Sequence, residues 1–233
     1  MSEELEDLLG IDRLAVFPLP LVLLPHELLP LHIFEPRYLQ MLKDIELERN
    51  FFGVSFFDGQ EVFVDRPPVG STGCVAEVRD IQTMPDQRSN ILTAGLMRYR
   101  LVEYIEVGAP YLTAKIHFFE DVEEDKKFTQ IKANEIFELF ERIAKAAFRL
   151  SGNRGNFPAI QRAEPEQLSF LVAAAFNLDN ELKYKMLEMT STVERLDRLK
   201  DILVPALTKI EESVDINKAA QTNGHSKTKI DIP

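Results

Sequence analysis

The first half of the chain carries apolar residues in short runs that predict β-strands, over residues 14–119. The run FFGVSFF at residues 51–57 has apolar side chains on both alternating faces, which is typical of a strand covered on both sides. Asp58-Gly59 supplies a turn after it, so EVFV at residues 61–64 is the predicted hairpin partner. Further strands are expected at residues 74–81, at two places within 91–105, and at 111–119.

One helix is predicted inside this β-rich half. Pro36 suits a first helical position because a proline lacks the N–H that would be unpaired there. Apolar residues then recur at helical spacing, at Tyr38, Met41, Leu42 and Ile45.

The acidic run at residues 120–125 marks the point where the apolar spacing becomes helical. The first helix beyond it is expected to end near Ser151-Gly152, since glycine commonly follows a helix end. Its buried face is predicted to combine Phe137, Phe140, Ala144, Ala147 and Phe148.

Three more helices are predicted after this one. Pro165 opens the first of them, which ends before Asn177, and the second covers residues 180–189. The last begins at the Ser-x-x-Glu capping box of residues 191–194, and Pro205 is expected to kink or end it. From about Glu211 the chain is polar and poor in large apolar groups, which predicts a disordered tail.

The formal net charge of −11 argues against a nucleic-acid partner, because phosphate binding relies on clustered lysine and arginine. A single cysteine and an acidic start, where a signal peptide would be basic, predict a cytoplasmic protein. The most apolar run, residues 14–31, is interrupted by four prolines and is not expected to span a membrane.

The sequence offers no recognisable catalytic or cofactor-binding motif. The pair Gly152 and Gly155 lacks the lysine and hydroxyl residue of a phosphate-binding loop, and there is no Gly-x-Ser-x-Gly elbow. Cys74 is interpreted as a buried small hydrophobe. The histidines lie apart, at His26, His32, His117 and His225. We therefore predict no enzyme activity, no catalytic residue, no cofactor and no metal site.

Three segments in order resemble the N-terminal, substrate-binding domain of Lon proteases. The first is FPLPLVLLPHELLPLHIFEPRY at residues 17–38, with the Glu-x-Arg-Tyr start of a helix. The second, at residues 70–105, contains the Gly-x-x-Arg-Tyr-Arg pattern as GLMRYR. The third, at residues 168–203, is similar to the leucine-rich signature of that family's closing helices.

This resemblance implies an α+β fold in which a PUA-like β-rich pseudo-barrel is followed by a helical bundle. We expect a β subdomain at residues 12–121, a helical subdomain at 126–209, and the disordered polar tail at 210–233. In Lon, an ATPase module and a Ser-Lys protease follow this domain. The chain contains neither, so we expect a free-standing, non-catalytic relative in which Pro205 interrupts the continuing helix.

The resemblance implies a module that binds unfolded or flexible polypeptide segments, including exposed apolar stretches. A separate protease or chaperone is a further partner class under this hypothesis. The alternative is a PUA-like RNA-binding protein, which the acidity disfavours.

The expected binding surface has two parts. The proline-broken loop, which lies within residues 17–34, would form an apolar patch with Leu23, Leu24 and Leu28, unless these leucines cover the sheet instead. The resemblance adds the start of the first helix, with Phe34, Glu35, Arg37 and Tyr38. The structural alternatives there are a helix cap for Glu35, a solvated charge for Arg37 and a core position for Tyr38.

Overall fold

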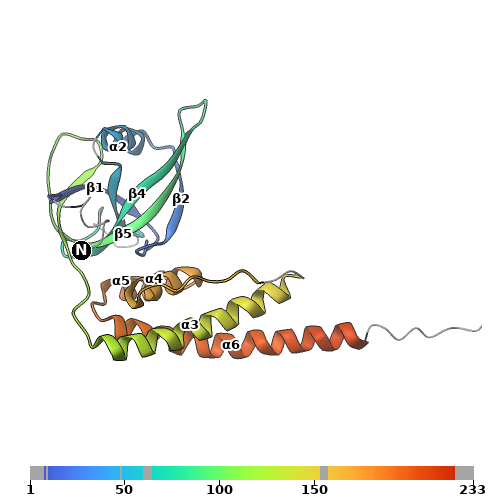
Figure 1. Ribbon diagram of the computed structural model, residues 1–233. Coiled ribbons are helices and arrows are strands. Elements are labelled where there is room, and N and C mark those ends of the chain that lie inside the picture. Colours follow the sequence, from blue (N-terminus) through green and yellow to red (C-terminus); the bar gives the residue numbers. More distant parts are fainter. Residues whose placement is uncertain (1–7, 9, 48, 60–64, 153–156, 224–233) are drawn as a thin grey trace, which may run out of the picture. The chain divides into compact units, whose positions relative to one another are not determined.

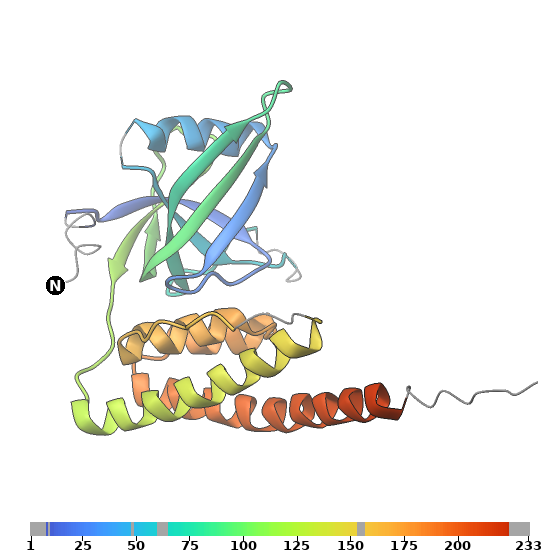
Figure 2. The same cartoon turned by 45° about the vertical axis from the view of Figure 1, so that its right-hand side comes forward.

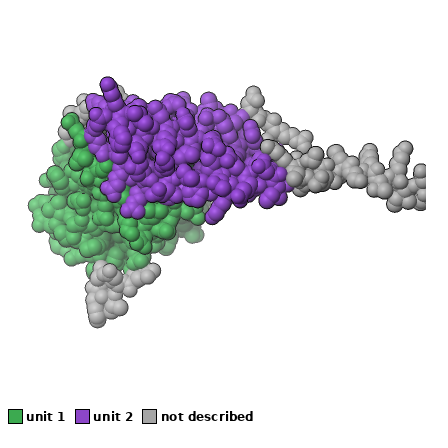
Figure 3. All heavy atoms as spheres, turned by 90° about the horizontal axis from the view of Figure 1, so that it is seen from below, with its two compact units in different colours: residues 1–123, 170–191 green, residues 124–169, 192–233 purple. Residues whose placement is uncertain are grey.

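The computed structural model describes residues 8, 10–47, 49–59, 65–152 and 157–223, with side chains described as far as residue 216. The predicted hairpin strand at 61–64 lies outside these residues. The contacts within the chain group it into two compact units (Figure 3). Unit 1 holds residues 1–123 and 170–191, and unit 2 holds residues 124–169 and 192–233.

Unit 1 is built on a six-stranded sheet that closes on itself. Its strands are β1 (Arg13–Leu19), β2 (Leu28–Ile33), β3 (Phe51–Phe56), β4 (Thr72–Thr83), β5 (Ser89–Tyr104) and β6 (Leu112–Phe118). The order is β2-β5-β4-β3-β1-β6, and a further pairing of β5 with β6 joins the last strand to the second. Five strands therefore form a closed barrel and β2 extends from it (Figures 1 and 2), in agreement with the predicted α+β class.

The length of β5 makes this arrangement possible. The sequence suggested two strands in this region, but the structure has one strand of 16 residues. Its first half pairs with β2 from Leu28↔Ala94 to Ile33↔Ser89, and its second half pairs with β6 from Tyr99↔Phe118 to Tyr104↔Ala114. One long strand thus serves both the barrel and the extension that carries β2.

The barrel interior is closed around Tyr99, which is fully buried. A Cβ atom added at Gly53 or Gly73 would lie only 2.5 Å from the Tyr99 hydroxyl oxygen, so both positions must lack a side chain. The hydroxyl group is paired with Ser55 Oγ at 2.8 Å. The Tyr99 ring therefore fills the barrel interior at a place where two strands carry glycine.

Helix α2 (Pro36–Glu46) lies across one end of the barrel (Figures 1 and 2). Its buried residues are Tyr38, Met41, Leu42 and Ile45, which confirms the predicted helix and its apolar face. Later in the chain, α4 (Pro165–Ala175) and α5 (Asn180–Glu188) also begin and end close to the predicted positions. Asp179 caps α5 by accepting the Leu182 N–H at 2.8 Å.

Unit 2 pairs α3 (Lys126–Leu150) with α6 (Thr192–Asn223), which lie side by side in Figures 1 and 2. Ion pairs join the two helices, Lys132 with Asp197 and Lys200 with Glu135, each at 2.5 Å. Helix α3 ends at the predicted place, with Ser151 as its C-cap.

The buried face of α3 differs in part from the predicted one. Phe137 is buried as expected, but Ala147 is exposed, and Ile136, Ile143 and Ala146 are buried instead. Spacing alone does not fix which side of a broad apolar face is buried.

Helix α6 continues through Pro205 and ends at Asn223. Residues 210–223, which the sequence assigned to a disordered tail, are thus helical. The contacts also place residues 170–191 in unit 1, so the grouping of the chain differs from a single boundary at residues 121–126. Among the described residues, no helix is both long enough and apolar enough to cross a membrane.

Candidate functional site

The proline-broken loop between β1 and β2 packs inward. Leu23 and Leu24 are 1% and 0% exposed, so these two leucines do not belong to the expected apolar patch and cover the sheet instead. The close approach depends on Gly95, where an added Cβ atom would lie 2.1 Å from the Leu24 carbonyl oxygen. The His26 N–H donates to the Gly95 carbonyl at 2.7 Å and fixes the loop on β5.

The same loop is tied to α5 by polar contacts within unit 1. Glu27 accepts the Leu24 N–H at 2.9 Å and pairs with Lys183 at 2.7 Å, and both charged side chains are mostly buried. Asn180 donates its side-chain N–H to the Pro20 carbonyl at 2.9 Å. The loop is therefore a structural connection between sheet and helix.

The strand that follows this loop presents apolar side chains to solvent. Leu28, Pro30 and His32 alternate along β2 with less exposed residues, and Leu28 is 62% exposed. Phe34, just beyond the strand, is 60% exposed, and its ring stacks on the His32 ring at 6.0 Å. We call these four residues the β2 stripe.

Strand β5 widens the β2 stripe. Leu92 is the partner of Pro30 across the sheet and is 36% exposed on the same face. His32 Nδ1 lies 2.7 Å from Asn90 Oδ1, which fixes the imidazole beside the Phe34 ring. Pro30, His32 and Leu92 were not among the predicted site residues, although the alternation in LLPLHIF indicates their shared face.

The remaining predicted site residues lie at the start of α2, and they are divided between the surface and the core. Glu35 and Arg37 form an ion pair at 2.8 Å with both side chains substantially exposed. Tyr38 is buried, its ring centroid 4.0 Å from that of Phe17, and burial raises the pKa of its hydroxyl. Leu28, Phe34, Glu35 and Arg37 are thus surface residues, whereas Leu23, Leu24 and Tyr38 belong to the core.

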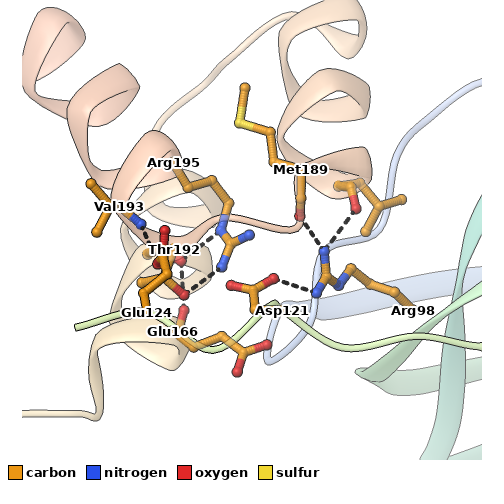
Figure 4. Close-up of polar contacts among 10 residues, drawn as sticks. Arg98, Asp121, Glu124, Glu166, Met189, Thr192, Val193 and Arg195 are labelled. Carbon is orange, nitrogen blue, oxygen red and sulfur yellow. Dashed lines mark hydrogen bonds and ion pairs between the residues drawn. The ribbon is translucent and has the colours of Figure 1, made fainter. Parts of the chain in front are cut away.

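The fourth position of the Gly-x-x-Arg-Tyr-Arg pattern is a buried arginine that binds other parts of unit 1. Arg98 on β5 donates to Asp121 Oδ1 at 2.6 Å and to the carbonyls of Leu187 and Met189 at 3.3 and 2.5 Å (Figure 4). Its guanidinium also lies 4.6 Å from the Phe119 ring centroid. Arg98 therefore holds the end of α5 against the sheet, and its role is structural.

Unit 2 contains a second buried arginine, Arg195, near the start of α6 (Figure 4). Its Nε donates to Ser169 Oγ at 2.8 Å, and Nη2 donates to Thr192 Oγ1 at 3.3 Å. Glu124 accepts the Val193 N–H at 3.0 Å, so a carboxylate from outside the helix caps its first turn. This cluster also serves folding.

A catalytic role would require side chains that can act as a nucleophile or bind a metal ion. Cys74 is fully buried, and burial raises the pKa of its thiol, which keeps it protonated and unreactive. Within the described parts of the chain, His, Cys, Asp and Glu side chains form no group of three or more that could hold a metal ion.

Comparison with known proteins gives the family. Residues 13–204 match the family model described as the ATP-dependent protease La (LON) substrate-binding domain. The Lon protease of Koribacter versatilis is 27% identical over 192 residues, which is 80% of this chain and 23% of that protein. The Lon protease of Bacillus thuringiensis is 27% identical over 182 residues, 77% of this chain and 22% of that protein. The chain thus spans about a quarter of the length of these relatives.

Solved structures agree on the fold. The Lon N-terminal domain protein from Xanthomonas campestris matches with a TM-score of 0.58 and 19% identity, and the N-terminal domain of Mycobacterium avium complex Lon protease with 0.61 and 17%. Each match covers 82% of this chain and 98% of the other. Because the family match spans most of the sequence, the chain belongs to the family of LON substrate-binding domains.

Proposed function

We propose that the chain binds unfolded or flexible polypeptide segments and that the β2 stripe is the contact surface. The observation that carries the proposal is the exposure of two large apolar side chains, Leu28 on β2 and Phe34 just beyond its end. Single exposed apolar residues are common, but here Pro30 and Leu92 extend the same face. Exposed apolar side chains gathered on one face are typical of an interaction site.

The position of β2 in the sheet supports binding of an extended segment. Among the strands that the structure describes, β2 is terminal and pairs with β5 alone, which suits the addition of a further strand at its outer edge. Pro30 has no N–H to donate, which limits the ladder that such a segment can form. We therefore expect side-chain contacts with the β2 stripe to contribute most of the affinity.

The proposal assigns no catalytic step to this chain. We propose that such binding serves to transfer the bound segment to a separate protease or chaperone in the cytoplasm. The net charge of −11 continues to disfavour an RNA ligand.

Fluorescence anisotropy with a labelled, permanently unfolded protein, such as reduced and carboxymethylated lactalbumin, tests the proposal. The double variant Leu28→Ser/Phe34→Ser should bind about tenfold more weakly, because two apolar side chains no longer leave water on binding. Both side chains are exposed, so the variant should retain its fold.

The matched control is Leu47→Ser/Val107→Ser, which removes two exposed apolar side chains elsewhere in unit 1; Leu47 is 88% exposed. The control should bind like the wild type. Equal losses in both variants, or a wild type that binds labelled RNA but no polypeptide, would contradict the proposal.

A further inference from the structure

Unit 1 has a pocket of about 500 Å³ that the β2 stripe does not include. It lies between the end of β3, the loop that precedes β4, and one face of α5. Its volume is within the range of about 300–1,000 Å³ that is usual for ligand pockets.

Aromatic rings form one part of the pocket lining. The Phe56 and Tyr184 rings are tilted by 46° to each other with their centroids 6.0 Å apart, and Phe57 and Pro68 add apolar surface. The Tyr184 hydroxyl accepts the Thr72 N–H at 3.0 Å, which holds this ring in place. Ring faces attract cations as well as apolar groups.

The charged residues of the lining are mainly acidic. Asp58, Glu181 and Glu188 contribute three carboxylates and Lys185 one ammonium group, a net charge of −2. Lys185 is itself paired with Glu181 at 2.6 Å. The pocket therefore combines aromatic faces with excess negative charge, which complements a cation attached to an apolar stem.

We propose that this pocket binds an arginine or lysine side chain of a polypeptide segment, together with a neighbouring apolar side chain. The aromatic rings contact the apolar stem and the face of the cation, and the carboxylates of α5 balance its charge. The inference rests on the proposed function in one respect, since the ligand is again a polypeptide. It adds a second surface and a preference for basic, apolar segments.

Two short peptides test the proposal on the full chain: a labelled peptide that alternates leucine and phenylalanine with arginine, and the same peptide with citrulline, an uncharged analogue of arginine. The wild type should bind the arginine peptide about tenfold more tightly at low salt. Glu181→Gln/Glu188→Gln should remove most of this preference, and 0.5 M salt should weaken it in the wild type, because exposed charges are screened.

The control variant is Glu103→Gln/Glu106→Gln, which removes the same number of charges from another surface of unit 1 and should keep the preference.

Equal binding of the two peptides by the wild type, or equal effects of the pocket and control variants, would overturn the inference. So would competition by spermidine that is as strong as competition by the unlabelled peptide, because a free cation would then suffice. Failure of the proposed function has a different signature: the unfolded protein would not bind the wild type at all. Failure of this inference alone leaves that binding intact.

Discussion

Three residues of β5 fix the geometry of unit 1, and each acts through a different kind of contact. Gly95 lets the Leu24 carbonyl approach the strand, Arg98 binds the end of α5, and Tyr99 fills the barrel between two glycines. These residues explain why the pattern Gly-x-x-Arg-Tyr matters for folding. None of them lies on the β2 stripe.

Replacement of Gly95 by alanine should lower the free energy of unfolding by about 3 kcal/mol, because the added methyl group meets backbone that cannot rotate away. The control is Gly108→Ala, where an added Cβ atom would meet nothing within 4 Å. Only the positive φ of 74° is unfavourable there, so the free energy of unfolding should fall by about 1–2 kcal/mol. Urea unfolding measures both. Equal losses would show that the Leu24 contact is not tight.

Buried tyrosines should make the protein sensitive to alkaline pH. Burial raises the pKa of Tyr104 to about 12, and its hydroxyl donates to the Pro67 carbonyl at 2.8 Å. In the unfolded chain this group ionises near pH 10, so its stabilising contribution is complete below pH 10 and is lost as pH rises toward 12. After allowance for solvent screening, the loss from Tyr104 is about 1–2 kcal/mol.

Urea unfolding of wild type and Tyr104→Phe at pH 9 and pH 12 measures this effect. Phenylalanine has no proton to lose. The amount by which the free energy of unfolding of the wild type exceeds that of Tyr104→Phe should therefore be smaller at pH 12 than at pH 9. A difference between the two proteins that is independent of pH would show that Tyr104 ionises equally in both states.

At the scale of elements, regular spacing was enough to predict α2, because four residues at helical spacing meet one core. Glycine and proline marked two helix boundaries, since Ser151-Gly152 located the end of α3 and Pro165 the start of α4. Spacing did not show that the proline-broken loop turns inward, since that depends on a missing side chain at Gly95, far away in sequence. The sequence left open whether Leu23 and Leu24 form a surface patch or cover the sheet, and it did not identify Leu92 of β5 as a neighbour of the β2 stripe.

Helix α6 shows how packing overrides a local preference. Pro205 lies inside the helix, where it removes one backbone hydrogen bond. The helix persists because Leu203 and Leu207, on either side of the proline, are buried. Packing of these leucines offsets the lost bond.

Pro205→Ala should therefore raise the free energy of unfolding by about 2 kcal/mol, since the lost bond is restored and the exposed ring contributes little packing. Urea unfolding together with far-ultraviolet circular dichroism measures stability and helix content. Thr208→Ala, at an exposed position one turn later, is the control and should change stability by less than about 0.5 kcal/mol. A loss of stability in Pro205→Ala would indicate that the ring makes a favourable contact.

At the scale of the whole molecule, unit 1 carries both surfaces that we assign to binding. The β2 stripe provides exposed apolar side chains, and the pocket beside α5 provides aromatic rings with negative charge. Unit 2 is organised around the α3–α6 pair and the buried Arg195. We thus assign polypeptide binding to unit 1.

Hydrogen exchange with mass spectrometry, on the full chain with and without saturating unfolded lactalbumin, tests this central claim most directly. Binding at the β2 stripe should slow amide exchange at residues 28–34 and at the paired residues 89–92, and should leave α2 beyond its first turn unchanged. Unchanged exchange at residues 28–34 under conditions of saturated binding would contradict the assignment of the β2 stripe.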